Sequence, residues 1–208
     1  VTAPGASGEL ANPGLRPESG RGRDFGIDWQ PVAVVNVGVR AFFNTIQDAI
    51  VTGVVNATQT RSENAGSAQA RGLEFDLRYA PKAELVLFTN LTRTLSRVDN
   101  PSSPDIHRTE VPFSPGAIAN IGLSGQLPGQ WTISPYFQWV GRYFDSNSRN
   151  GRLAFGNYGV LNLRLQRPLA AGIDLFADLN NLGNRHYRMP FDFRDPGVNA
   201  FGGVHVSF

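Results

Sequence analysis

The chain has 208 residues, of which 41% are hydrophobic and 17% charged, and it contains no cysteine. The apolar fraction is sufficient for a packed core or a lipid-facing surface, so a wholly disordered chain is excluded. The absence of cysteine excludes a disulfide scaffold, a cysteine-ligated zinc site, an iron–sulfur cluster and thiol catalysis. The formal net charge of +2 and the scattered arginines predict no nucleic-acid partner.

Nearly every apolar stretch alternates with a period of two, which predicts an all-β chain. Nine strands are expected, and several have about the length with which a tilted strand crosses a bilayer. In chain order they span residues 23–29, 34–47, 68–79, 84–96, 117–125, 131–143, 157–166, 173–181 and 201–208. No run of about 18 apolar residues occurs, so no transmembrane helix is predicted.

Short and long connections alternate along the chain. The short ones are tight turns rich in proline and glycine, at residues 30–33, 80–83, 126–130 and 167–172. The long ones are polar and span residues 48–67, 97–116, 144–156 and 182–200. An up-and-down meander would place all short turns at one end and all long loops at the other, as in outer-membrane barrels. A Greek-key sandwich has no reason to sort its loops in this way.

The predicted strands have two chemically different faces. In the strand that starts at residue 34, valines alternate with polar or small residues, and elsewhere mid-strand charges lie on one side only. A polar face is the outside of a soluble sandwich but the inside of a membrane barrel, and periodicity alone leaves both open. Trp29, Tyr79 and Trp131 flank the short turns, where a lipid–water interface would place an aromatic girdle.

Motifs for catalysis or metal binding are absent from the sequence. The three histidines lie far apart, and none has a second ligand at the spacing that a metal site on one helix requires. Neither a nucleophile elbow nor a phosphate-binding or dinucleotide-binding fingerprint occurs. Asp99, Asp105 and Glu110 share one long loop, but solvated loops commonly carry such charges. The sequence therefore predicts no enzyme, no bound metal and no cofactor.

Three local sequences are more specific. Residues 12–18 read Asn-Pro-Gly-Leu-Arg-Pro-Glu, a proline-stiffened entry to the first predicted strand. Residues 180–187 read Asn-Asn-Leu-Gly-Asn-Arg-His-Tyr, where a strand runs into a turn rich in asparagine and glycine. The chain ends on an alternating strand whose last residue is Phe208.

Together and in this order, these segments resemble the C-terminal part of the barrel of TonB-dependent outer-membrane receptors. That family carries an NP-x-L-x-PE segment in an extracellular loop, then a G-x-E strand, an NNL-x-(D/N)-x-x-Y segment and a terminal aromatic residue. The matching segments here are residues 12–18, Gly72-Leu73-Glu74, residues 180–187 and Phe208. The resemblance covers essentially the whole chain.

The resemblance implies an antiparallel up-and-down transmembrane β-barrel in the outer membrane of a Gram-negative bacterium. It implies a non-enzymatic receptor that imports a scarce extracellular ligand, such as a ferric siderophore, with energy delivered through TonB, ExbB and ExbD. Its other partners would be the outer-membrane lipid, the receptor's own plug domain and the barrel assembly machinery. The resemblance implies no cofactor.

Three sets of candidate residues follow from this interpretation. The long loops offer aromatic and cationic side chains that suit an anionic, aromatic chelate: Tyr143, Phe144, Arg149, Arg152, His186, Tyr187, Arg188, Phe191 and Phe193. The polar side chains that would line the lumen and contact the plug are Arg40, Asn44, Glu74, Asp76, Arg78, Arg164, Asp174 and Asp178. Val204, Val206 and Phe208 resemble the terminal signal that the assembly machinery reads.

The chain departs from the family in size, because the family's barrel has about 22 strands and surrounds an N-terminal plug. We therefore expect a fragment in which residues 1–22 belong to an extracellular loop and residues 23–208 to the C-terminal part of the barrel, without plug or signal peptide. Nine antiparallel strands would leave open edges whose backbone groups are unpaired in lipid. Two other classes remain open: a passive porin-like or small outer-membrane barrel, and a soluble β-sandwich that binds a ligand.

Overall fold

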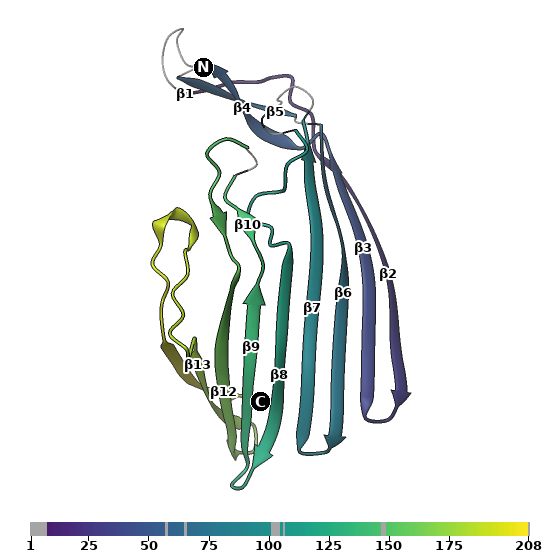
Figure 1. Cartoon of the computed structure of the whole chain (residues 1–208), viewed down its shortest axis with the longest axis vertical. Coiled ribbons are helices and arrows are strands. Elements are labelled where there is room, and N and C mark those ends of the chain that lie inside the picture. Colours follow the sequence, from purple (N-terminus) through teal and green to yellow (C-terminus); the bar gives the residue numbers. More distant parts are fainter. Residues whose placement is uncertain are drawn as a thin grey trace.

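One antiparallel sheet dominates the computed structural model, which describes residues 8–56, 58–64, 66–100, 105, 107–146 and 149–207. Its strand order is β14-β13-β12-β9-β8-β7-β6-β3-β2, so each strand pairs with the sheet strands before and after it in the chain (Figure 1). The strands are β2 (Ser19–Val32), β3 (Val35–Gln47), β6 (Ser67–Lys82), β7 (Leu85–Asp99), β8 (Ala117–Leu127), β9 (Trp131–Val140), β12 (Tyr158–Ala170), β13 (Ile173–Asn180) and β14 (Asn199–Val206). The predicted all-β meander of nine strands is confirmed.

Several strand ends differ from the expected ones. The strand expected at residues 131–143 ends at Val140, and Tyr143 belongs to a separate short strand. Most other strands are longer than expected: β2 begins at Ser19 rather than at residue 23, and β12 continues to Ala170. Hydrophobic alternation stops where side chains become polar, whereas backbone pairing continues past that point, so alternation underestimates strand length.

Segments expected to be loops contain small sheets of their own. A hairpin of β4 (Ile50–Asn56) and β5 (Gln59–Asn64) pairs in parallel with β1 (Gly8–Leu10), and β10 (Tyr143–Phe144) pairs with β11 (Ala154–Phe155). The described residues include one helical element, a 3-10 turn at Pro190–Asp192. None of their helices is long and apolar enough to span a membrane.

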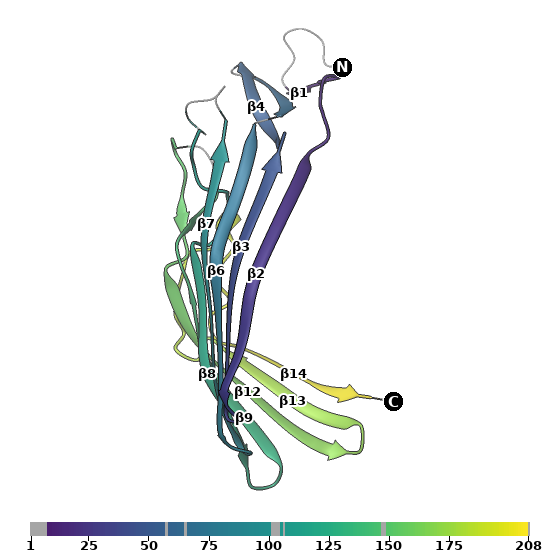
Figure 2. The same cartoon turned by 90° about the vertical axis from the view of Figure 1, so that its right-hand side faces the viewer.

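The short turns and the long connections lie at opposite ends of the sheet, as the alternation of connection lengths predicts. Figure 1 shows the β2–β3, β6–β7, β8–β9 and β12–β13 turns at the bottom and the small sheets and loops at the top. Figure 2 shows that the sheet is bent, with β12, β13 and β14 turned away from β2, β3 and β6. One turn depends on glycine: Gly172 has a φ of +71°, and a Cβ there would lie 2.5 Å from the Ser207 carbonyl oxygen.

The strand register separates an apolar face from a polar face. Cross-strand partners in an antiparallel sheet project to the same face. One row of partners on the apolar face runs Ile27, Val39, Phe75, Leu91, Ala119 and Trp139. The adjacent row on the polar face runs Asp28, Gly38, Asp76, Asn90, Asn120 and Gln138.

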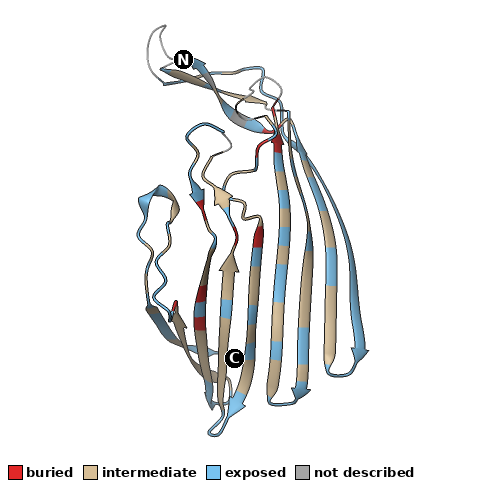
Figure 3. Cartoon of the chain, viewed as in Figure 1, coloured by how far each residue is buried: buried red, intermediate tan, exposed pale blue. Residues whose placement is uncertain are grey.

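The apolar face has no second layer of structure packed against it in the described part of the chain. Ile27 is 72% exposed, Ile121 60% and Leu73 57%, and the few buried residues are small or lie mainly near the loops (Figure 3). Soluble monomers rarely expose an apolar patch that extends over a whole sheet. This exposed face therefore does not favour the soluble β-sandwich, because a sandwich would cover it with a second sheet.

Candidate functional site

Three long connections meet at the loop end of the sheet. They join β7 to β8, β9 to β12 and β13 to β14. The Phe113 amide of the first donates a 2.8 Å hydrogen bond to the Phe144 carbonyl of the second, and the rings of Phe113 and Phe191 link the first to the third at 5.5 Å. The Arg149 amide of the second also donates to the Asp105 carbonyl of the first at 3.0 Å. We call this assembly the loop cluster.

Stacked aromatic rings form one part of the loop cluster. The rings of Tyr158 and Tyr187 lie 3.8 Å apart and only 8° from parallel, and those of Tyr143 and Phe155 stack at 5.7 Å. The Arg188 guanidinium lies 5.4 Å above the Phe155 ring. Burial and the charge of Asp195 raise the pKa of Tyr187, so its hydroxyl is neutral at physiological pH. This part offers flat rings and a polar hydroxyl to a ligand.

Arginines form the other part of the loop cluster. The Arg152 guanidinium lies 3.7 Å above the Phe144 ring and forms an ion pair with Glu110 at 2.5 Å. Arg142 lies 5.5 Å from the same ring, and Arg149 donates to the His107 carbonyl at 2.8 Å. A cavity of about 550 Å³ opens beside them, and its lining consists of Ser96, Arg97, Arg108, Thr109, Glu110, Arg149 and Arg152. The lining has one carboxylate among four arginines, and Asp99 pairs with two of these, Arg97 and Arg108, so the cavity has a net positive charge.

The carboxylate of Glu110 stays ionised beside these arginines. Burial raises its pKa, but the hydrogen bond from Arg152 and the nearby positive charges outweigh burial, so its pKa lies below the ordinary 4.5. Asp99 lies 2.7 Å from Arg97. Within the described ranges, no three histidine, aspartate or glutamate side chains gather in a way that would hold a metal ion. The carboxylates of Asp99 and Glu110 are therefore arranged as partners for arginines, whereas that of Asp105 accepts hydrogen bonds from Asn150.

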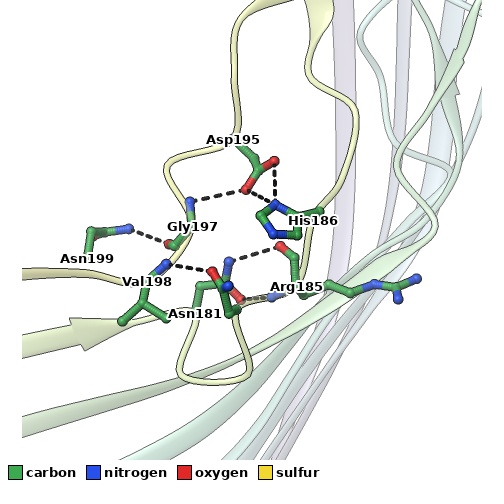
Figure 4. Close-up of polar contacts among 8 residues, drawn as sticks. Asn181, Arg185, His186, Asp195, Gly197, Val198 and Asn199 are labelled. Atoms are coloured by element: carbon green, nitrogen blue, oxygen red, sulfur yellow. Dashed lines mark hydrogen bonds and ion pairs between the residues drawn. The ribbon is translucent and has the colours of Figure 1, made fainter.

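Asparagine side chains hold the base of the β13–β14 connection (Figure 4). Asn181 is 3% exposed, and its amide group accepts from the Arg185 amide at 2.8 Å and donates to the Arg185 carbonyl at 3.0 Å. Its own backbone amide donates to Oδ1 of Asn162 at 3.0 Å, which ties the loop to β12. The asparagines of residues 180–187 thus have a structural role: their hydrogen bonds to the backbone replace the strand pairing that ends at β13.

A second tie closes the same connection. His186 Nδ1 lies 3.3 Å from the Asp195 carboxylate, and Asp195 also accepts from the Gly197 amide at 3.1 Å (Figure 4). Burial raises the pKa of Asp195, but the hydrogen bonds from His186 and from backbone amides outweigh burial and lower it. These contacts therefore hold in place the end of the connection that precedes β14.

Most of the candidate loop residues come together in the loop cluster. These are Tyr143, Phe144, Arg149, Arg152, Tyr187, Arg188 and Phe191. His186 instead pairs with Asp195, and Phe193 is 67% exposed without a ring partner among the described residues. The sequence interpretation missed Phe113, Arg142, Phe155 and Tyr158. All four lie in the long connections or at their edges, but only the fold shows that they face the other loops.

The candidate lumen residues all lie on the polar face. Arg40 is the cross-strand partner of Glu74, and Asp174 is the partner of His205. Charged atoms of Arg164 and Asp178, which are also cross-strand partners, lie 3.5 Å apart. A cavity of about 740 Å³ hollows this face between β2 and β7, with Asp28, Arg40, Asp76, Arg78 and Asn90 among its lining. The candidates did not include Asp28, whose carboxylate lies 3.6 Å from the Arg40 guanidinium. They also did not include Asn90, which donates a hydrogen bond to Asp76 at 2.5 Å.

The candidate assembly residues lie in β14. Val204 and Val206 pair with Leu175 and Ile173 on the apolar face and are 55% and 46% exposed. Phe208 lies outside the described residues.

Comparison with known proteins identifies the family. The family model described as TonB dependent receptor-like, beta-barrel matches residues 2–182. A search of curated protein sequences found no match. Many solved chains share the fold.

Three of these structures illustrate the similarity. A variant of the ferric enterobactin receptor PfeA from Pseudomonas aeruginosa has a TM-score of 0.75 at 19% identity, over 96% of this chain and 33% of that chain. The siderophore receptor PirA from Acinetobacter baumannii has a TM-score of 0.74 at 18% identity, over 98% of this chain and 35% of that chain. The copper transporter OprC has a TM-score of 0.74 at 18% identity, over 93% of this chain and 32% of that chain.

The chain spans about one third of the length of these structures. At such identities the likeness establishes the fold alone, whereas the family model covers most of the sequence. The chain therefore belongs to the TonB-dependent receptor-like β-barrel family.

Proposed function

We propose that this chain is part of the barrel of an outer-membrane receptor that binds a scarce metal chelate, such as a ferric siderophore, and imports it with energy delivered through TonB. The observation that carries the proposal is the loop cluster, in which three long connections bring stacked rings and arginines to one end of the sheet. Rings stack on the aromatic groups of such a chelate, and guanidinium groups pair with its negative oxygens.

The solved relatives support import of a metal in some form, but they differ in cargo. They include receptors for ferric enterobactin and for a siderophore, and a copper transporter. One barrel fold thus serves several cargoes, so the loops and not the strands must distinguish them. The cationic cavity beside Arg149 and Arg152 favours an anionic complex over a bare metal cation. The passive porin-like alternative is not favoured, because the matching family model is that of receptors.

The two faces of the sheet suit the two surroundings that a receptor barrel provides. The apolar face would contact the lipid of the outer membrane. The polar face, with Arg40, Asn44, Glu74, Asp76, Arg78, Arg164, Asp174 and Asp178, would line the lumen and hydrogen-bond to a plug domain. The sheet edges β2 and β14 have backbone groups that lipid cannot satisfy. We therefore propose that both edges pair with further strands of a closed barrel.

The remaining partners follow from the same proposal. Energy would come from TonB with ExbB and ExbD, which act on a part of the receptor other than this sheet. Val204, Val206 and Phe208 would form the signal that the barrel assembly machinery reads. Deletion of Phe208 from the intact protein is expected to reduce its folded amount in the outer membrane, and an unchanged amount would contradict this role.

The test of the proposed function uses the intact protein that contains this chain, expressed in cells that lack their own siderophore receptors. Radioactive iron supplied as ferric enterobactin is expected to accumulate in TonB-containing cells and not in TonB-deficient cells. Tyr187→Ala is expected to weaken binding of ferric enterobactin roughly 10- to 100-fold, because it removes a stacked ring of the loop cluster.

Tyr79→Ala is the matched control, since Tyr79 lies at the turn end of β6. Accumulation that does not need TonB, or equal binding by both tyrosine variants, would overturn the proposal. Binding of copper(II) ions with no binding of ferric enterobactin would contradict the class of cargo.

A further inference from the structure

The connection between β3 and β6 begins as a continuation of the pair that these two strands form. Gln47 of β3 pairs with Ser67 of β6. Three residues further along each strand, Ile50 of β4 pairs with Asn64 of β5, so the register is kept. The direction is not kept, because Figure 1 shows the small sheet of β1, β4 and β5 turned across the line of β3 and β6. The β4–β5 hairpin is therefore a bent continuation of the β3–β6 hairpin.

The bend lies at Asp48 and Gly66. Their φ angles are +55° and +99°, and the Asp48 amide donates a 2.8 Å hydrogen bond to the Gly66 carbonyl. Glycine adopts a positive φ freely, whereas a residue with a side chain adopts it at a cost that surrounding contacts must offset. With an extended backbone at Asp48, β4 would continue in the direction of β3. The bend therefore depends on the contacts that hold Asp48.

Residues 12–18, the segment before β2 that contains two prolines, provide these contacts, and we call them the clamp segment. The Arg16 guanidinium forms an ion pair with the Asp48 carboxylate. Asn64 joins both residues, because its side-chain amide donates to the Asp48 carbonyl at 2.5 Å and to the Arg16 carbonyl at 3.0 Å. Its Oδ1 accepts from the Arg16 amide at 3.0 Å. Three residues that are far apart in the chain thus meet at the bend.

The two ends of the clamp segment hold one strand of the hairpin each. The side-chain amide of Asn12 donates to the Ser62 carbonyl on β5 at 2.9 Å. Oε1 of Glu18 accepts from the Ile50 amide at the start of β4 at 2.6 Å. The prolines restrict the backbone of the segment, so little conformational freedom is lost when it holds the hairpin. A short hairpin is only marginally stable by itself, and its position therefore depends on the clamp segment.

We infer that the clamp segment positions the β4–β5 hairpin as a wall of the entrance through which cargo reaches the loop cluster. The hairpin lies at the same end of the sheet as that cluster (Figure 1). Arg16, Asp48 and Asn64 are positioning residues, which fix the bend and do not touch the cargo. A wall that is already fixed needs no ordering when the cargo binds, and this raises affinity. The statement about cargo rests on the proposed function, whereas the statement about the bend does not.

The first test measures the bend in the intact, detergent-purified protein that contains this chain. Spin labels are attached at Thr52→Cys in β4 and at Ile121→Cys in β8, and this chain supplies no other cysteine. Electron paramagnetic resonance is expected to give one narrow distribution of distances between the labels. Asn64→Ala removes three hydrogen bonds from the bend, so the distribution is expected to broaden and to shift to longer distances.

Two variants serve as controls for this measurement. Asn56→Ala is matched to Asn64→Ala, because it removes asparagine hydrogen bonds from the tip of the same hairpin and not from the bend. Arg16→Lys keeps a cation opposite Asp48 and leaves the backbone bonds of the segment in place. Both are expected to keep the narrow distribution, whereas Arg16→Ala is expected to broaden it. Heat-modifiable migration in gel electrophoresis verifies that each protein is folded.

The second test measures binding and import of ferric enterobactin by the same proteins without labels. Asn64→Ala is expected to weaken binding roughly tenfold, because the hairpin must then be ordered when the cargo binds. The maximal import rate per folded receptor is expected to stay unchanged. Arg16→Lys and Asn56→Ala are expected to change the affinity by less than about threefold. A purely structural role would instead lower the amount of folded receptor and leave its affinity unchanged.

Two outcomes would overturn the inference. One is an unchanged distance distribution in folded Asn64→Ala, since the clamp segment would then not set the bend. The other is a broadened distribution with unchanged affinity for ferric enterobactin, since the hairpin would then not be a wall of the entrance. If the unaltered protein binds no ferric enterobactin, the proposed function and the statement about cargo fail together. The distance measurement uses no cargo, so it decides the statement about the bend in every case.

Discussion

The two faces of the nine-stranded sheet differ in the sign of their charge as well as in polarity. The polar face carries nearly all acidic residues of the strands, together with three arginines: Asp24, Asp28, Glu74, Asp76, Asp174, Asp178, Arg40, Arg78 and Arg164. The apolar face carries arginines at Arg21, Arg23, Arg71, Arg93, Arg97 and Arg167 and a single carboxylate, Asp99. Charges of both signs thus occur on the face that would line a wet interior, and cations predominate where lipid would lie.

This difference has a physical reason. In a wet interior, carboxylates and guanidinium groups neutralise each other, as Arg164 and Asp178 do at 3.5 Å. At a lipid boundary, long cationic side chains extend to the headgroups, whereas a short carboxylate is held close to the apolar layer. At the turn end, the long side chain of Arg167 likewise extends towards the boundary of the apolar face. Its guanidinium lies 5.5 Å above the ring of Trp131.

The largest effect is expected when a charge is moved from one face to the other. Asn90→Arg and Leu91→Arg are adjacent changes on opposite faces of β7. Leu91→Arg is expected to lower the free energy of unfolding by about 2–4 kcal/mol, the cost of arginine near the middle of the bilayer. Urea unfolding of the intact protein in phospholipid vesicles measures this cost.

Asn90→Arg serves as the control for that change. It places a cation beside Asp76, to which Asn90 now donates, so its effect is expected to stay below about 1 kcal/mol. Equal losses for the two variants would mean that both faces meet the same surroundings, which would contradict the assignment of lipid to one face.

A smaller effect is expected where the polar face continues into the loops. Asn181→Ala removes the bonds to Arg185 from a side chain that is only 3% exposed, so a loss of about 1–3 kcal/mol is expected. Asn184→Ala removes one exposed bond to Val198 and is the control, with a loss below about 1 kcal/mol. Unfolding and hydrogen exchange over residues 181–198 check both values, and a reversed order would contradict the structural role of Asn181.

Ion pairs of the polar face are expected to contribute less. A double-mutant cycle with Arg164→Ala and Asp178→Ala is expected to give a coupling below about 1 kcal/mol, because the side chains are 43% and 27% exposed. Urea unfolding of the four proteins provides the coupling. A value above about 2 kcal/mol in the intact protein would contradict a wet interior at this point and indicate that the plug excludes water there.

The smallest effect is expected from acid. The pKa of Glu110 lies below its ordinary 4.5, so its ion pair with Arg152 contributes above that pH and is lost as the pH falls through the lowered pKa. The thermal midpoints of the unaltered protein and Glu110→Gln are therefore expected to differ at about pH 7 and to converge as the pH falls through the lowered pKa of Glu110. A difference that persists at low pH would assign the effect to packing and not to charge.

The strands and their faces could be predicted from the sequence because both depend on neighbours two residues apart. Val35 and Val37 lie on one face because a strand alternates, and alternating connection lengths placed the turns at one end. Strand ends were less accurate, as at Val140 and Ala170, since backbone pairing does not require apolar side chains. The β1–β5 pairing was missed because it joins segments about 50 residues apart.

The sequence by itself determined that this chain forms long alternating strands with one polar and one apolar face, because those properties are local. Only the tertiary structure decided which side chains meet. Loop residues such as Phe113 and Phe191 are far apart in the chain, and their stacking depends on how β7, β9 and β13 deliver the three connections to one end. Arg23 and Arg71 likewise share a face, one on each side of Phe43, only through register, since a shift of one residue between two strands would move one of them to the polar face.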